Sequence, residues 1–112
     1  MPVPDPELAA AICAALRRQV EKLGLSIGDE PQVDGLAFAE TVDPYSREVS
    51  LVGSWQGQRS GSLTFFADGR VFAEYQVLLP CPGDARRYVE AVQVWGRPAQ
   101  LRGEPVFGEF AG

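Results

Sequence analysis

Hydrophobic and polar residues alternate between Ser60 and Leu79, which predicts two strands joined by a tight turn. The turn contains Asp68-Gly69, a dipeptide typical of β-hairpins. A two-residue turn would leave one face of the hairpin half polar, whereas a three-residue turn with a bulge at Gly69 separates an apolar face from a polar one. We therefore predict the bulged register. Its cross-strand pairs are Phe66 with Arg70, Phe65 with Val71, Leu63 with Ala73 and Gly61 with Tyr75.

Near the N-terminus the apolar residues recur every three or four positions, which predicts an amphipathic helix over about 5–24. Asp5 and Pro6 are typical of a helix start, because an aspartate caps free N–H groups and proline suits the first helical position. Gly24 is well placed as the left-handed residue after the helix. The apolar stripe consists of Leu8, Ile12, Leu16, Val20 and Leu23, with Cys13 on its flank as a buried filler.

Further stretches of alternation predict a series of strands after the helix. The segment 80–87 contains two prolines and a glycine and is predicted to be a rigid, exposed loop. The stretch 88–96 is largely apolar on both sides, as in a central or doubly covered strand, and Pro105 indicates an edge strand. The predicted strands are 36–42, 48–55, 60–66, 70–79, 88–96 and 100–107.

One helix followed by five or six strands with short connections predicts an α+β fold. We expect a single domain over residues 1–112, with the helix packed on one face of a curved antiparallel meander. A chain of 112 residues is long enough to bury a hydrophobic core without disulfides or metals. No second domain is expected.

The charged residues exclude several classes of function. Fifteen acidic residues against nine arginines and one lysine give a net charge of −5, so a nucleic-acid backbone would be repelled. No apolar run approaches the ~20 residues that a membrane helix requires. The chain has no histidine, which removes Ser-His-Asp and Cys-His catalysis and histidine-ligated zinc. We predict no enzyme, no cofactor and no metal.

The N-terminal segment and the cysteines indicate a cytoplasmic protein. The first seven residues contain no basic region ahead of an apolar stretch, so they do not have the pattern of a signal peptide. The two cysteines, Cys13 and Cys81, are far apart in the sequence, and a reducing cytoplasm disfavours a disulfide between them. Cys81 is interpreted as an inert loop residue.

The candidate binding residues are aromatic and acidic side chains of the predicted strands. If Phe72 and one tryptophan lie on the sheet face away from the helix, they form an adhesive patch; otherwise they belong to the core. Acidic residues fall one to a strand, so two could meet as a carboxylate pair or form a loosely acidic docking face. The residues selected are Trp55, Phe72, Tyr75, Trp95, Glu74 and Glu90.

These observations lead to two hypotheses on function. The first is a binding or accessory protein that acts through its sheet, such as an inhibitor or immunity-type partner of a basic protein. The alternative is a small-ligand carrier, a lipocalin-like or cystatin-like cup whose pocket lies between sheet and helix. That pocket would be lined by Trp55, Phe65, Tyr75 and Trp95. An enzyme would instead require a cleft that holds Glu74 or Glu90.

A short motif bears on the second hypothesis. Gly53-Ser54-Trp55, ahead of the strand pair that turns at Asp68-Gly69, resembles the opening of a lipocalin-type barrel. The resemblance covers only these residues, and the capped N-terminal helix departs from the order of that family. The sequence therefore identifies no family.

Self-association is the last expectation. One helix of about five turns covers only part of a sheet of five or six strands, and a second copy related by a twofold axis would cover the rest. We predict a homodimer with Phe72 and a residue of 88–96 in its interface. The competing outcome is a monomer whose sheet closes on itself.

Overall fold

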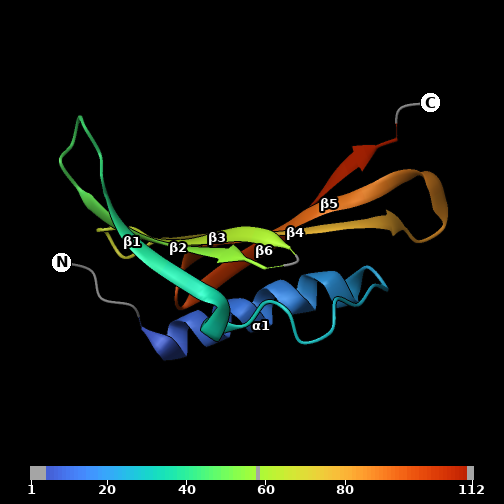
Figure 1. Cartoon of the computed structure of the whole chain (residues 1–112), viewed down its shortest axis with the longest axis horizontal. Coiled ribbons are helices and arrows are strands. Elements are labelled where there is room, and N and C mark those ends of the chain that lie inside the picture. The colour runs from blue at the N-terminus through green and yellow to red at the C-terminus, as the bar shows by residue number, and fades with distance from the viewer. Residues whose placement is uncertain (1–4, 58, 111–112) are drawn as a thin grey trace.

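Helix α1 (Pro6–Lys22) precedes six strands in the computed structural model, which describes residues 5–57 and 59–110 (Figure 1). All six strands belong to one antiparallel sheet in the order β1-β2-β3-β4-β5-β6, and the 3-10 helix η1 (Val33–Gly35) precedes β1. The predicted α+β meander is confirmed, with six strands. The strands are β1 (Leu36–Val42), β2 (Val49–Gln56), β3 (Ser60–Phe65), β4 (Val71–Cys81), β5 (Asp84–Arg97) and β6 (Gln100–Glu109).

Helix α1 begins and ends with the capping residues that the sequence predicts. The Asp5 Oδ1 atom accepts hydrogen bonds from the backbone N–H groups of Glu7 (3.0 Å) and Leu8 (3.2 Å). Gly24 follows the helix with a φ of 77°, the left-handed conformation that glycine adopts most readily. The predicted apolar stripe lies toward the core, and Cys13 is buried beside it. The first four residues, part of the segment interpreted as lacking a signal peptide, lie outside the described residues.

The β3–β4 hairpin has the predicted bulged register. Phe65 lies opposite Val71, Leu63 opposite Ala73 and Gly61 opposite Tyr75. The Phe66 N–H donates to the Arg70 carbonyl (2.9 Å), and Gly69 has a φ of 91°. The bulge matters for the rest of the molecule because it determines which side chains of both strands face the helix.

The segment 80–87 was predicted as a loop, and that prediction is wrong. β4 runs to Cys81 and β5 begins at Asp84, so only Pro82-Gly83 connects them. The polar residues of this segment obscure the strand pattern because this end of the hairpin is largely exposed on both sides. Backbone pairing does not depend on that pattern: Cys81 pairs with Asp84 and Arg87 pairs with Glu109.

Irregular pairing bends the far end of β4, β5 and β6. The β4–β5 register shifts between Gln76 and Leu79, where Leu78 has a φ of 53°, and the β5–β6 register shifts between Val89 and Ala91. Bulges bend the strands that contain them. Because the two shifts lie side by side, this end of the sheet turns away from α1 (Figure 1).

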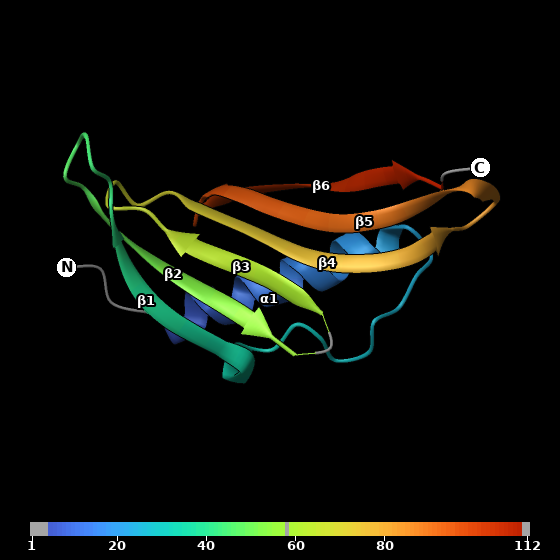
Figure 2. The ribbon, with the colours of Figure 1, turned by 45° about the horizontal axis from the view of Figure 1, so that its top comes forward.

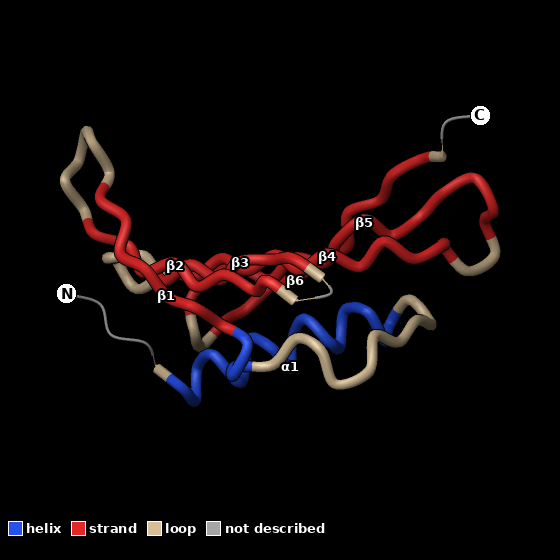
Figure 3. The backbone as a smooth tube through the Cα atoms, in the orientation of Figure 1, coloured by secondary structure: helices blue, strands red, loops and turns tan. Residues whose placement is uncertain are grey.

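Helix α1 and the loop that follows it cover one face of the sheet (Figure 3). The helix packs against β4, β5 and β6. The loop beside it is fastened by the Arg17 Nη1 atom, which donates to the Pro31 carbonyl (2.7 Å), and by the indole N–H of Trp55, which donates to the Gln32 carbonyl (2.9 Å). An ion pair from Arg59 to Glu30 (3.0 Å) adds a third connection.

The other face of the sheet carries no helix or strand among the described residues (Figure 2). The segment 88–96 was predicted to be a central or doubly covered strand, and the first alternative is confirmed: β5 lies between β4 and β6, with α1 packed on one of its two sides. β1 and β6 are the two edges of the sheet, so the sheet is open and Pro105 lies in an edge strand as predicted. None of the helical segments that the structure describes has the length and apolar character of a membrane span.

Candidate functional site

The candidate site is the sheet face away from α1, which we call the open face. Cross-strand pairing arranges its side chains in two neighbouring rows, because directly paired residues point to the same side of a sheet. The first row, from β2 to β6, consists of Val52, Thr64, Phe72, Trp95 and Arg102. The second row consists of Ser54, Ser62, Glu74, Gln93 and Glu104. An apolar row therefore runs beside a polar one.

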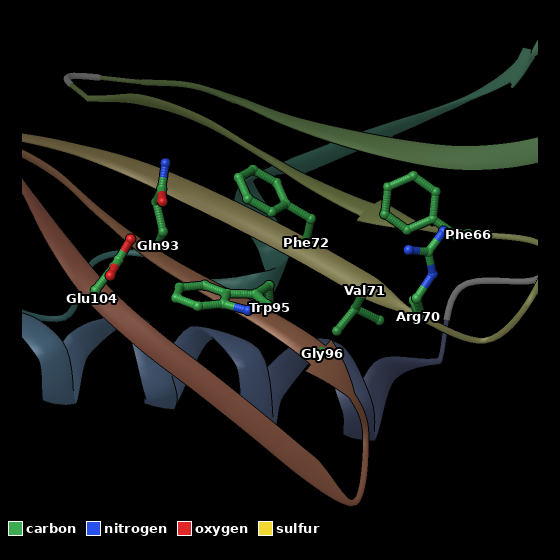
Figure 4. A pocket seen from close by; sticks show the side chains of 8 residues that line it. All are labelled: Phe66, Arg70, Val71, Phe72, Gln93, Trp95, Gly96 and Glu104. Carbon is green, nitrogen blue, oxygen red and sulfur yellow. The ribbon is translucent and has the colours of Figure 1, made fainter.

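A hollow of about 400 Å³ lies over the middle of the first row (Figure 4). The rings of Phe72 and Trp95 form its floor, and both side chains are only half-buried. At one end the Arg70 guanidinium lies 5.3 Å from the centre of the Phe66 ring and forms an ion pair with Asp68 (2.7 Å). The hollow thus combines an aromatic floor with a cation at its rim.

The second row holds a hydrogen bond between neighbouring strands. The Gln93 Nε2 atom donates to the Glu74 Oε2 atom at 2.6 Å. The cross-strand neighbours of Glu74 are Ser62 and Gln93, so pairing places no second carboxylate directly beside it. The Glu74 carboxylate is therefore held in place by an amide rather than arranged as half of a carboxylate pair.

A second hollow, of about 470 Å³, lies at the bent end of the sheet. It is lined by Leu78, Tyr88, Phe110 and Glu109, and the Tyr88 and Phe110 rings lie 5.0 Å apart. Tyr88 precedes the buried Val89 and points to the opposite side of β5, so this hollow also belongs to the open face. The open face therefore carries apolar side chains at two places along its length, with the polar second row between them.

The structure divides the candidate residues between the two sides of the sheet. Phe72, Trp95 and Glu74 lie together on the open face. Glu90 is exposed where the β5–β6 register shifts. Trp55 and Tyr75 are 5% and 3% exposed in the core, with their rings edge to face at 5.2 Å.

The four residues predicted to line a pocket between sheet and helix do not lie around one cavity in the structure. Trp55, Phe65 and Tyr75 are packed in the core, whereas Trp95 lies on the opposite side of the sheet. A smaller hollow of about 200 Å³ touches Trp55 and Tyr75 at the edge of the core. The hollows of about 400 and 470 Å³ lie on the open face instead.

Sequence reasoning missed several members of the open face. Phe66 and Arg70 were placed there by the bulged register, but they were not selected as candidates. Gln93 could have been found in the same way, because it follows from pairing β5 with β4. No local signal pointed to Phe110, which is brought beside Tyr88 by the extension of β5 and β6 beyond the predicted strand ends.

Two buried groups of the core have raised pKa values, which make the stability of the fold depend on pH. Burial raises the pKa of the Cys13 thiol from 9.0 to about 11. Burial and, next, the nearby Glu30 carboxylate raise the pKa of the Tyr75 hydroxyl from 10.0 to about 12. Both groups are neutral when protonated. The unfolded chain loses these protons at lower pH than the folded chain does, so the unfolded state becomes favoured as the pH rises.

We therefore expect the two protonated groups to make their full contribution to the free energy of unfolding below about pH 9. This contribution should be lost progressively between pH 9 and 12. Urea midpoints at pH 8 and pH 10.5 measure the loss. Tyr75→Phe should lose less stability between these two pH values than the matched variant Tyr45→Phe, because Tyr45 is 94% exposed. Equal losses in the two variants would contradict the assignment to Tyr75.

Comparison of the chain with protein-family models, curated proteins and solved structures finds no match. Among the described residues, no group of three or more cysteine, aspartate or glutamate side chains is placed to hold a metal ion. The inference of function therefore depends on the open face itself.

Proposed function

We propose that this protein is a small, non-enzymatic binding protein of the cytoplasm that acts through protein contacts of its open face. One observation carries the proposal: the half-buried rings of Phe72 and Trp95 lie side by side in the middle of the first row, on a sheet face that no described element covers. Aromatic side chains at the centre of a patch are the residues that most often dominate protein interfaces. The polar row beside them supplies hydrogen-bonding groups for the rim.

The distribution of charged residues along the chain indicates what charge a partner of the open face would meet. Residues 1–56 contain nine acidic and four basic residues, whereas residues 57–112 contain six of each. The first row ends in Arg102 and the second in Glu104. A partner of the open face would thus meet a balanced rim around an apolar centre, rather than the acidic surface expected from net charge. An inhibitor or immunity-type protein, which works by covering its partner, is one form of this role.

A small-ligand carrier is the second candidate. The hollow over Phe72 and Trp95, at about 400 Å³, falls within the range of roughly 300–1,000 Å³ that is usual for ligand sites. The ligand would bind on the open face, between the aromatic floor and Arg70, and not between sheet and helix.

Photo-crosslinking in the native host tests the first candidate. A benzophenone amino acid at Thr64 lies on the open face beside Phe72, and the same group at Tyr45 lies at the tip of the β1–β2 hairpin as the matched control. We expect a discrete protein adduct from position 64 and none of the same mass from position 45, because the partner covers the open face.

Two results would count against protein binding. Adducts of equal mass and yield from both positions would show contacts that do not depend on the open face. No adduct from position 64, together with a small molecule retained on the purified protein in native mass spectrometry and lost in Trp95→Ala, would support the carrier instead.

A further inference from the structure

We propose that the partner of the open face is a second copy of this chain, so that two open faces pack together about a twofold axis. The inference rests on the proposed function, since it names the partner of the same surface. Three features of the open face support it: shape, charge and area.

The first feature is the curvature of the sheet. Figure 1 shows the β1–β2 turn at one end and the β4–β5 turn at the other, and both rise away from α1. The open face is therefore concave along its length. A twisted sheet curves in the opposite sense across its other diagonal and so has the form of a saddle. Two identical saddles are complementary when one is turned over so that the concave direction of one crosses the concave direction of the other. A second copy thus supplies the complementary shape.

The second feature is the balance of charge. Around the aromatic rings lie two cations, Arg70 and Arg102, and the anions Glu74 and Glu104, with a further anion, Asp68, in an ion pair with Arg70. In a twofold interface the same patch meets itself, so a patch with a charge excess would repel its copy, whereas a balanced patch can pair opposite charges. The acidic surplus of the chain belongs to residues 1–56. Charges of the open face therefore permit self-association despite the net charge of −5.

The third feature is area. The molecule measures 45 × 29 × 27 Å, and the open face runs along its longest dimension. A face of this size offers on the order of 1,000 Å², compared with the roughly 800 Å² that each partner buries in a standard interface. Phe72 and Trp95 lie in the middle of its first row, with Thr64 on one side and Arg102 on the other, and aromatic residues surrounded by other contacts often dominate binding. One open face is therefore large enough to form a specific dimer.

Sedimentation equilibrium across a hundredfold range of micromolar concentrations tests the proposal. We expect the wild-type mass to approach twice the chain mass of 12.1 kDa. Trp95→Glu should sediment as a single chain, with a loss of at least about thirtyfold in the association constant, because a buried tryptophan would be replaced by a charge. Tyr45→Glu, at the exposed hairpin tip, should remain dimeric and is the matched control.

A wild-type mass of one chain over the whole range would overturn the proposal, and so would a dimer that persists in Trp95→Glu. Circular dichroism tests whether Trp95→Glu is folded. If it is not, Thr64→Arg places a charge in the same row and decides the question in its place. A monomeric wild type that still forms a position-64 adduct with a different protein would overturn self-association while leaving the proposed function in place.

Discussion

Replacing Leu16 with alanine is expected to lower the free energy of unfolding by about 2–5 kcal/mol. Leu16 is fully buried at the middle of the apolar stripe of α1, where the helix lies on the sheet. The substitution removes three buried carbon atoms and leaves a cavity that a well-packed core fills only in part. Urea unfolding at fixed chain concentration measures the loss as a lower midpoint at similar slope.

The matched control is Glu21→Ala, in the same helix but exposed to solvent. Its free energy of unfolding should stay within about 0.5 kcal/mol of the wild type. A loss below about 1 kcal/mol in Leu16→Ala would mean that α1 contributes little to the core, contrary to the packing described above.

Gly61→Ala is expected to destabilise the fold by about 1–3 kcal/mol, although it adds a single methyl group. Gly61 lies opposite Tyr75 in the β3–β4 ladder. A Cβ atom at position 61 would lie 2.5 Å from the Glu74 carbonyl oxygen and 3.0 Å from the Tyr75 Cα atom. Both are backbone atoms of β4, which is paired on either side, so they cannot move aside without disturbing two ladders.

Gly57→Ala is the appropriate comparison for this substitution. Among the described residues, beyond its chain neighbours, no atom lies within 4 Å of a Cβ built at Gly57. Its thermal midpoint should therefore change little, while that of Gly61→Ala falls by several degrees. Equal midpoints for the two variants would show that β3 and β4 pack less closely than the structure indicates.

Most of the fold follows from local signals in the chain. The start of α1 depends on the Asp5 carboxylate, and its end depends on the freedom of Gly24 to adopt a positive φ. The β3–β4 register depends on Gly69 in the turn and on one apolar face of the hairpin. Each signal acts within a few residues, so the sequence suffices to predict the helix, the hairpin and the order of the strands.

The ends of β4 and β5 could not be predicted in this way. Their pairing beyond Gln76 depends on backbone hydrogen bonds between strands that are largely exposed here, and such bonds leave no hydrophobic pattern. The bend at Leu78 has the same origin, because a bulge is a property of two paired strands.

The chain by itself determined that this protein is an acidic α+β meander without histidine, and that either tryptophan could belong to the core or to a surface. Only the tertiary structure shows which tryptophan lies in the core and which lies on the surface. Trp55 lies on the side of the sheet that faces α1, where its N–H group donates to the Gln32 carbonyl in the loop after α1, whereas Trp95 pairs with Phe72 on the side that the helix leaves uncovered. The face to which a strand residue points is set by register with its neighbours and by the position of α1, and both arise from contacts between residues distant in sequence.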